Sequence, residues 1–233
     1  MEVETTHQHS AYISIPAEKV VAGRDSYLPL KRALDLVLAG VALVLLSPLM
    51  ALIALGIKLY SPGPVLFRQQ RVGKDGAEFS CLKFRSMKQD TDSSLHRRHT
   101  RQLIRQNTRP DQTGPQSLKL QHDPRITGIG AILRRASLDE LPQLFNVLRG
   151  EMSLIGPRPP IPYEVEVYQE WHHRRFDVLP GITGLWQVQG RNQVSFDEMV
   201  RMDIDYIERM SLALDLWILM MTPIAVLKGK GAG

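Results

Sequence analysis

The sequence predicts a mainly helical α+β protein with a few short strands and one hydrophobic membrane helix. Three observations support this fold class. Residues Leu36–Ile57 form an apolar run without a charge, the stretch 141–148 repeats apolar residues at helical spacing, and two strand-like segments flank a pair of glycines. We divide the chain into a flexible N-terminal segment (1–26), a membrane element (27–60) and a third region (61–233).

The apolar run Leu36–Ile57 is long enough to cross a bilayer. At about 1.5 Å per residue, an unbroken helix of this length reaches about 33 Å. The run begins too far along the chain for a signal peptide, and the segment before it carries acidic residues such as Glu2, Glu18 and Asp25. A buried helix of a soluble core is less favoured, because no charged residue interrupts the run.

Ser47 and Pro48 interrupt the run near its middle. Pro48 cannot donate a hydrogen bond to the carbonyl of Val44, and Ser47 can bond back to a carbonyl one turn earlier, so both favour a bend. Basic residues flank the run on both sides, which suits a helix that returns to the same leaflet, whereas a spanning helix usually has a one-sided bias. A kinked spanning helix and a re-entrant helix both stay open. The flanking residues are Arg24, Lys31, Arg32, Lys58, Arg68, Arg71 and Lys74.

The region after the membrane element begins with a turn and a hairpin. Ser61–Pro64 ends the helix, and Val65–Met87 is typical of two short strands joined near Gly73 and Gly76. Residues 88–123 are mostly polar and rich in arginine. We expect part of them to form a basic helix that faces lipid phosphates or solvent.

Helices dominate the C-terminal half of the chain. The first begins near Ser137–Asp139 and ends before Gly150. Ser195 and Glu198 predict a capping box at the start of another helix, which ends near Met210. The apolar face of the first helix is expected to consist of Leu141, Leu144, Phe145 and Leu148. The other expected elements are an extended segment at Gly156–Pro162, a helix at Tyr163–Asp177, a glycine-rich turn at Gly181–Asn192 and an apolar run at Leu216–Leu227. This last run is too short to span a bilayer, and it suits either a membrane interface or the protein core.

The composition restricts the possible partners without choosing one. A net charge of +5 suits nucleic acid, an anionic membrane surface or phosphorylated substrates about equally. The single cysteine, Cys81, excludes an intrachain disulfide and a cysteine-rich zinc site. The sequence has no Walker phosphate loop, no dinucleotide-binding glycine motif and no pattern typical of a serine or cysteine hydrolase.

Asp139 and Glu140 are the first candidates for chemistry. Near a helix N-terminus a carboxylate stays ionised, and the same place attracts phosphate or a metal–phosphate complex. An ionised carboxylate can attack phosphorus, and its neighbour can hold Mg²⁺. The alternative is a capping box between Ser137 and Glu140, with Asp139 there only for the helix dipole.

Several arginines and one lysine are candidates for phosphate binding. Lys83 and Arg85 lie on one face of a predicted strand, Arg134 precedes the acidic pair, and Arg158 stands between prolines that fix its backbone. The alternatives are a solvated strand edge for Lys83 and Arg85, a basic surface for Arg134, and a structural turn for Arg158.

Asp203 and Asp205 resemble the short acidic pair with which many nucleotide-sugar transferases hold a metal ion. On a helix these two carboxylates point about 200° apart and cannot share one ion, so only Asp203 remains a candidate. Two histidine pairs lack further ligands in pattern, and we expect them to be solvated polar residues. They are His96 with His99 and His172 with His173.

Taken together, these segments resemble the bacterial sugar transferase family, the monotopic phosphoglycosyl transferases. The resemblance covers residues 31–228, and it is specific because all the segments stand in the same order and spacing. They are KRALDLVLA with the Ser47-Pro48 break, SPGPVLFRQQRVG, KFRSM, LRRASLDELPQLFNVLRGEMSLIGPRP, PGITGLWQVQGRN and the helix that carries Asp203. Residues 90–122 are longer than in the smallest members, and we expect no additional N-terminal membrane domain of the kind that larger members carry.

The resemblance implies a re-entrant membrane helix, a small cytoplasmic catalytic domain (61–233) with interfacial amphipathic helices, and a place in the bacterial inner membrane. It implies transfer of a sugar-1-phosphate from a UDP-sugar to a polyprenyl phosphate, with release of UMP, as the first step of exopolysaccharide, O-antigen, capsule or glycoprotein glycan synthesis. Asp139 corresponds to the nucleophile, and Glu140 to the residue that helps hold Mg²⁺. Lys83, Arg85, Arg134, Arg158 and Asp203 correspond to the family's substrate-binding residues.

The expected partners are therefore the nucleotide-sugar, the polyprenyl phosphate and membrane lipid, with no nucleic acid and an open possibility of a homo-oligomer. Two other functions stay under consideration. A metal-dependent glycosyltransferase would move the sugar alone and release UDP. A membrane scaffold or polymer-export partner would use the basic 88–123 region to bind lipid without catalysis.

Overall fold

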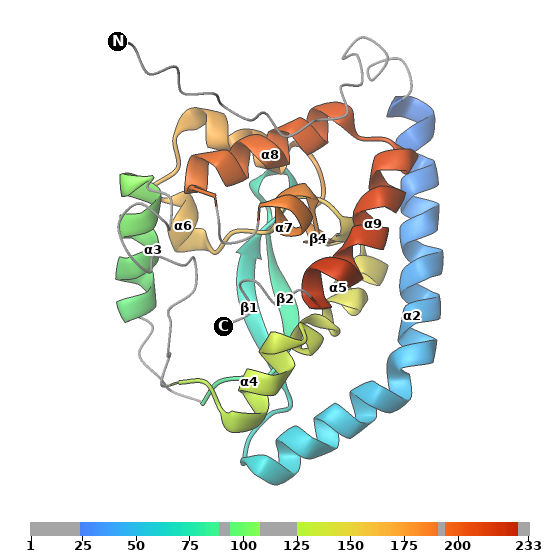
Figure 1. The fold of residues 1–233 in the computed structure, drawn as a ribbon, viewed down its shortest axis with the longest axis vertical. Coiled ribbons are helices and arrows are strands. Elements are labelled where there is room, and N and C mark those ends of the chain that lie inside the picture. The colour runs from blue at the N-terminus through green and yellow to red at the C-terminus, as the bar shows by residue number, and fades with distance from the viewer. Residues whose placement is uncertain (1–23, 89–93, 108–124, 191–193, 228–233) are drawn as a thin grey trace, which may run out of the picture.

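The computed structural model describes residues 24–88, 94–107, 125–190 and 194–227. The fold is mainly helical with two small two-stranded sheets, in agreement with the predicted α+β class (Figure 1). The expected flexible segment (1–26) lies almost wholly outside these residues, as does the end of the glycine-rich turn Gly181–Asn192.

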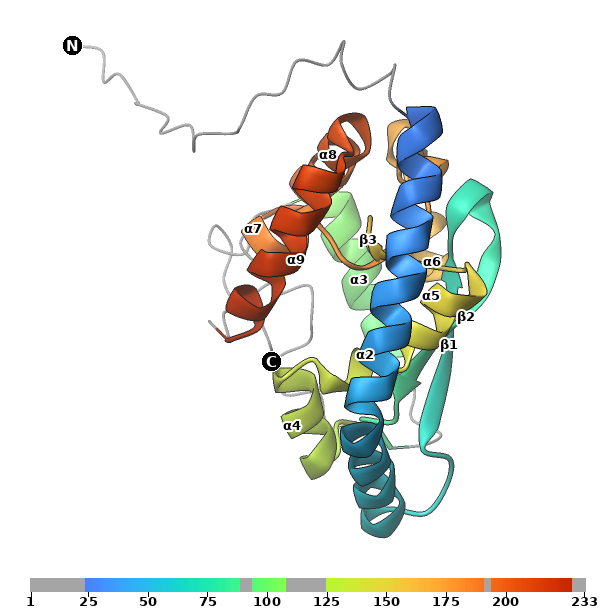
Figure 2. The same cartoon turned by 90° about the vertical axis from the view of Figure 1, so that its right-hand side faces the viewer.

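The apolar run lies in one long helix, α2 (Arg24–Tyr60), along one side of the molecule. The helix changes direction in its second half (Figures 1 and 2). Pro48 lies inside it, and Ser47 Oγ donates a hydrogen bond of 2.8 Å to the carbonyl of Val44. The bend expected at this pair of residues is confirmed.

Most of the apolar surface of α2 does not pack against the rest of the protein. Among the described residues, Ser26–Tyr60 is the helical stretch long and apolar enough to cross a membrane, and 11% of its most apolar part is buried. Val44 and Leu45 have exposed fractions of 73% and 72%. A helix of a soluble core would bury such side chains, so this alternative fits the structure poorly.

Two of the basic residues that flank the apolar run do not face outward. Lys31 is buried and pairs with Asp215 at 3.0 Å, and Arg71 is buried and donates to the carbonyl of Pro159 at 2.7 Å. Neither is placed to meet lipid headgroups. Lys31 and Arg71 therefore do not support the prediction that positive charge faces the membrane surface on both sides of the run.

The predicted hairpin is confirmed. Strands β1 (Leu66–Val72) and β2 (Glu78–Phe84) pair in antiparallel fashion, joined by the 3-10 turn η1 (Lys74–Gly76). Gly76 has φ +76°, a left-handed conformation that favours glycine. The hairpin lies in the middle of the view in Figure 1 and at one edge of the molecule in Figure 2, so it forms part of one face of the fold.

Helix α3 (Ser94–Gln106) is the expected basic helix, but only part of it faces outward. Leu103 and Ile104 are buried, and Arg101 forms an ion pair with Glu166. The helix packs against α6 (Pro162–Val165) and α8 (Phe196–Arg209). Arg98 and Arg105 keep exposed side chains.

The region of the acidic pair comprises two helices with a turn between them: α4 (Gly128–Arg135), the 3-10 turn η2 (Leu138–Glu140) and α5 (Gln143–Arg149). Gly150 ends α5 with φ +82°, as expected. The predicted apolar face of α5 was partly wrong, because Phe145 and Leu148 are exposed while Asn146 is fully buried. The Asn146 side chain accepts from Leu82 N–H at 3.0 Å and donates to the carbonyl of Ser80 at 2.8 Å, so it pairs backbone groups of β2 that would otherwise be unsatisfied.

After α5 the chain forms a short parallel pair and the remaining helices. Strands β3 (Ser153–Ile155) and β4 (Gly181–Thr183) pair in parallel. The single helix expected at Tyr163–Asp177 is instead α6 followed by the 3-10 helix η3 (Glu170–Asp177), because Gln169 is extended and its N–H donates to His172 Nδ1. Short helix α7 (Leu185–Gln189) precedes α8, whose capping box of Ser195 and Glu198 is confirmed.

The last helix, α9 (Leu212–Leu227), lies close to the first half of α2 (Figures 1 and 2). Asp215 connects three segments, because its carboxylate accepts hydrogen bonds from Tyr27, Lys31 and Tyr206. Ile218 is fully buried, whereas Met220 and Leu227 are largely exposed. One face of α9 therefore packs against the core and the other does not.

Candidate active site

Asp139 and Glu140 lie in the short turn η2 between α4 and α5. Ser137 adopts a left-handed conformation (φ +55°), and its side chain makes no capping hydrogen bond, so the alternative of a Ser137–Glu140 capping box was wrong. The pair also does not belong to the first turn of α5, which begins after Pro142. The Asp139 side chain is largely buried, with an exposed fraction of 7% for the residue.

Lys83 of strand β2 reaches the acidic pair. Its ammonium group lies 2.7 Å from Glu140 Oε1, and both side chains are partly shielded from solvent. From the sequence, Lys83 was a candidate for phosphate binding and Glu140 a candidate for catalysis, with no link between them. In the structure they form an ion pair. A cation beside two adjacent carboxylates lowers the cost of holding their negative charge, and it can also attract a phosphate.

Arg85, two residues further along, has a different environment. Its guanidinium donates to the carbonyl of Pro62 at 2.6 Å and to the carbonyl and hydroxyl of Ser61, both at 2.8 Å. Arg85 is buried, with 6% exposed, and these contacts fix the turn that follows α2. In this structure its guanidinium is directed to that turn.

Arg134 lies in the last turn of α4, five residues before Asp139 in the sequence. The start of α4 is fixed by Thr127, whose hydroxyl accepts from Gly130 N–H at 3.0 Å. Gly130 allows a close approach here, since a Cβ at this position would lie 2.0 Å from the carbonyl oxygen of Ser86. A side chain at position 130 would therefore displace α4. Because Arg134 lies on α4, the position of Arg134 also depends on this glycine.

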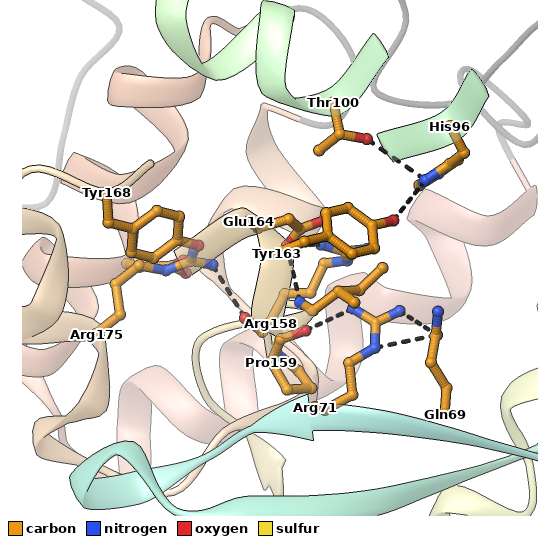
Figure 3. Close-up of polar contacts among 12 residues, drawn as sticks. Gln69, Arg71, His96, Thr100, Arg158, Pro159, Tyr163, Glu164, Tyr168 and Arg175 are labelled. Atoms are coloured by element: carbon orange, nitrogen blue, oxygen red, sulfur yellow. Dashed lines mark hydrogen bonds and ion pairs between the residues drawn. The ribbon is translucent and has the colours of Figure 1, made fainter. Parts of the chain in front are cut away.

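Arg158 lies in the extended segment after β3, and Figure 3 shows its surroundings. Its guanidinium is 3.6 Å from Glu164 Oε2 and about a third of its side chain, 36%, is exposed. The backbone of the same segment is held by two buried arginines. Arg175 donates to the carbonyl of Arg158 at 3.0 Å, and Arg71 donates to that of Pro159 at 2.7 Å.

Asp203 of α8 lies in the protein interior. Its Oδ2 is 2.7 Å from Arg175 Nη2, and each of these side chains is 1% exposed. Burial raises the pKa of Asp203 to about 6, although Arg175 and Arg158 act in the opposite direction. Asp205 instead pairs with Arg209 at 2.8 Å, so the two carboxylates do not share a site, as the helical spacing predicted.

The bacterial sugar transferase family model matches residues 26–229. The chain belongs to the bacterial sugar transferase family. It is 43% identical over 202 residues to the exopolysaccharide production protein ExoY of Rhizobium meliloti (strain 1021), and the match covers 87% of each chain. The resemblance derived from the sequence motifs is therefore confirmed.

Longer relatives match the chain over a smaller part of their own length. The undecaprenyl-phosphate galactose phosphotransferase of Salmonella typhimurium (strain LT2) is 42% identical over 204 residues, which is 87% of this chain and 41% of the relative. The UDP-glucose:undecaprenyl-phosphate glucose-1-phosphate transferase of Escherichia coli (strain K12) is 42% identical over 211 residues, with the same two shares. The chain thus spans about two-fifths of these longer transferases.

The donor set of this bacterial sugar transferase fits a hard divalent cation better than zinc. Among the described residues, no three His, Cys, Asp or Glu side chains gather into a metal-binding group. Mg²⁺ usually takes only one or two carboxylates and completes its shell with water and substrate phosphates, so Asp139 and Glu140 suit it. One histidine of each pair is engaged elsewhere. His172 is buried, which corrects the expectation that it is solvated, and His96 lies 2.7 Å from Tyr163 Oη.

Sequence reasoning missed Arg71, Arg175 and Glu164, which surround Arg158. Arg71 was counted among the basic residues flanking the membrane helix, and Arg175 did not stand out beside Arg174. Their buried positions follow from contacts with Asp203 and with the proline-rich segment, which are distant in sequence and lie on other elements. The one available signal was that the carbonyl oxygens of a proline-rich segment need hydrogen-bond donors. This signal does not identify which residues supply them.

Proposed function

We propose that this bacterial sugar transferase moves a sugar-1-phosphate from a UDP-sugar to undecaprenyl phosphate, at the cytoplasmic face of the bacterial inner membrane. The observation that carries the proposal is the buried Asp139 beside Glu140, with Lys83 2.7 Å from Glu140, in a chain of this family. Relatives named as undecaprenyl-phosphate sugar phosphotransferases support the substrate class. The product would begin the synthesis of an exopolysaccharide or another surface glycan.

The first step is attack by a carboxylate oxygen of Asp139 on the β-phosphorus of the UDP-sugar. A new O–P bond forms, the bond from this phosphorus to the oxygen bridging the two phosphates breaks, and UMP leaves with that oxygen. In the second step a phosphate oxygen of the acceptor attacks the same phosphorus. The Asp139 carboxylate leaves, and undecaprenyl-diphosphate-sugar forms.

The surrounding residues hold charge during these steps. Lys83 neutralises part of the negative charge next to Asp139, and Arg158 offers a planar fork of donors for a phosphate. Arg134 adds positive charge from the end of α4. Glu140 would hold Mg²⁺, with Asp139 beside it. The bound ion would supply neutralisation of the diphosphate charge.

Transfer of a whole phosphosugar is distinguished from transfer of the sugar alone by the released nucleotide. The purified protein, incubated with a panel of UDP-sugars and undecaprenyl phosphate, should release UMP. Release of UDP would favour a metal-dependent glycosyltransferase, and absence of any nucleotide release would favour a scaffold.

The covalent step is tested by mass spectrometry of protein quenched after incubation with UDP-sugar and no acceptor. We expect an adduct of sugar-phosphate mass on the peptide that contains Asp139. Asp139→Asn should abolish the adduct and lower turnover at least about 10³-fold, because it removes the anionic oxygen while keeping size. Asp177→Asn, at the exposed end of η3, is the matched control. Nucleotide release that requires acceptor, without any trapped adduct, would refute the covalent mechanism.

We further propose that α2 is re-entrant, so that both of its ends lie on the cytoplasmic side. The bend at Ser47 and Pro48 supports this topology. Single cysteines at Leu28 and Leu66 test it, since both positions are exposed and the native Cys81 is buried. A membrane-impermeant maleimide should label neither site in intact cells and both after permeabilisation. Labelling of Leu28→Cys alone from outside would mean that α2 spans the membrane.

A further inference from the structure

We infer that Asp203 acts on this reaction through Arg175, as a positioning residue for Arg158, and does not touch substrate or metal. The inference rests on the proposed function, because it concerns the arginine that would engage phosphate there. It assigns a role to Asp203 that differs from the direct substrate contact expected from the sequence.

The segment that carries Arg158 is attached to the rest of the protein through its backbone carbonyls. Proline has no N–H, so a segment rich in proline can be tied to its surroundings mainly through its carbonyl oxygens. Four consecutive carbonyls, from Pro157 to Pro160, each accept a hydrogen bond from outside the segment. Their donors are Gly181 N–H (2.9 Å), Arg175 (3.0 Å), Arg71 (2.7 Å) and Val72 N–H (2.9 Å).

Two of these donors are charged side chains that need partners of their own. A buried guanidinium loses the solvation of its charge, and an anion or well-placed acceptors must replace it. Arg71 has Gln69 Oε1 at 3.1 and 2.6 Å. Arg175 has the carboxylate of Asp203, and its Nη1 also donates to Tyr168 Oη at 2.8 Å.

The contact between Asp203 and Arg158 passes through a single nitrogen. Arg175 Nη2 lies 2.7 Å from Asp203 Oδ2 and donates to the carbonyl of Arg158 at 3.0 Å. Loss of the carboxylate charge would leave that guanidinium buried with an uncompensated charge, and it would have to move or take up water. The carbonyl of Arg158 would then lose its donor.

Asp203 itself is poorly placed to contact a ligand. Its side chain is 1% exposed, whereas the Arg158 side chain is 36% exposed. Glu164 lies on one side of the Arg158 guanidinium, and its carboxylate also accepts from Ile161 N–H at 3.0 Å. The backbone of Arg158 is thus fixed from the interior by Arg175 (Figure 3), while its side chain is partly exposed, an arrangement suited to presenting a rigid fork to phosphate.

A double-mutant cycle between Asp203→Asn and Arg158→Ala tests the inference. UMP release gives kcat and KM, and UDP titrated in a calorimeter gives an affinity that does not depend on turnover. In the wild-type background we expect Asp203→Asn to lower kcat/KM and UDP affinity about 10-fold or more. In the Arg158→Ala background the same change should have an effect of less than about 2-fold, because the residue through which Asp203 acts is gone.

Asp205→Asn is the matched control, on the same helix and paired with the partly exposed Arg209, and it should change neither quantity. Equal losses from Asp203→Asn in both backgrounds would overturn the inference, since an independent contact or a general loss of structure predicts them.

Should Asp203→Asn fail to fold, Tyr168→Phe removes one acceptor from Arg175 more gently. Its effect should likewise disappear with Arg158→Ala, and an unchanged effect would overturn the inference. If the wild-type protein binds UDP but releases no UMP, the proposed function is refuted. The coupling between Asp203 and Arg158 can still be measured from UDP affinity, so the inference about Asp203 is tested separately.

Discussion

Asp215→Asn should destabilise the protein strongly, because one buried carboxylate joins three helices. Its Oδ2 accepts from Tyr27 Oη at 2.7 Å and from Lys31 Nζ at 3.0 Å, and its Oδ1 accepts from Tyr206 Oη at 2.7 Å. Asp215 and Lys31 are 8% and 7% exposed. Asparagine keeps the size but removes the charge, and it turns one of the two acceptor atoms into a donor that faces other donors.

The magnitude follows from the number of contacts and their burial. Breaking a buried ion pair by neutralising one partner costs about 3–5 kcal/mol, because the other charge stays buried without compensation. For a chain of this size, about 1 kcal/mol lowers the melting temperature by about 2–4 °C. We therefore expect an apparent melting temperature about 6–20 °C below that of the wild type.

The assay is thermal unfolding of detergent-solubilised protein at one fixed scan rate, followed by tryptophan fluorescence. Asp205→Asn is the control, because Asp205 pairs with Arg209 at one-turn spacing on a partly exposed helix face. Such a pair contributes at most about 0.5 kcal/mol. If the two variants melted within about 2 °C of one another, the reasoning that Asp215 holds α2 against α8 and α9 would be refuted.

Three further predictions follow from single positions. Gly130→Ala should lower the melting temperature and the yield of folded protein, because its Cβ would lie 2.0 Å from the carbonyl oxygen of Ser86, whereas Gly40→Ala has no atom within 4 Å and should be tolerated. Burial raises the pKa of Asp203 to about 6, so the native state binds this proton at a higher pH than the unfolded chain does; the free energy of unfolding should therefore fall as pH rises from about 4 to about 6, and urea titrations of Asp203→Asn should lack that slope. Arg158→Lys should lower kcat/KM although it keeps the charge, since lysine cannot reproduce a planar fork, and near-wild-type steady-state rates would show that Arg158 is only structural.

The elements that the sequence predicted well are those determined by local patterns. The bend at Ser47 and Pro48, the hairpin around Gly76 and the cap of α8 at Ser195 each depend on residues within a few positions of one another. Local rules of backbone geometry and capping are sufficient for such features. The acidic pair was found for a similar reason, although its turn turned out to precede α5 as a separate element.

The features that the sequence did not predict are those in which a polar residue is buried by a distant partner. Lys31 and Asp215 are 184 positions apart, and either of them alone is typical of a solvated surface. Asn146 occupies a core position on α5 because its side chain forms hydrogen bonds with backbone groups of strand β2. The apolar periodicity of α5 does not predict this position. Local patterns carry no information on such contacts, so Arg71 and Arg175 could not be assigned in advance.

The contacts of α2 with α5 have a consequence for the proposed mechanism. Arg32 donates to the carbonyls of Val147 and Leu148 at 2.7 and 3.2 Å, at the C-terminal end of α5, where a cation is favoured by the helix dipole. Asp35 accepts from the Ser153 hydroxyl at 2.7 Å and from Leu154 N–H at 3.1 Å.

These contacts place the acidic pair at a fixed distance from the anchor. Helix α5 is about 10 Å long, and Glu140 lies just before its start. With α2 as the proposed membrane anchor, Asp139 is therefore held at one depth relative to the bilayer. An anchor joined by a flexible linker would let the nucleophile sample many depths, and each encounter with a lipid-bound phosphate would require that freedom to be lost again. The polar contacts between α2, α5 and β3 remove this entropic cost during folding, before either substrate binds.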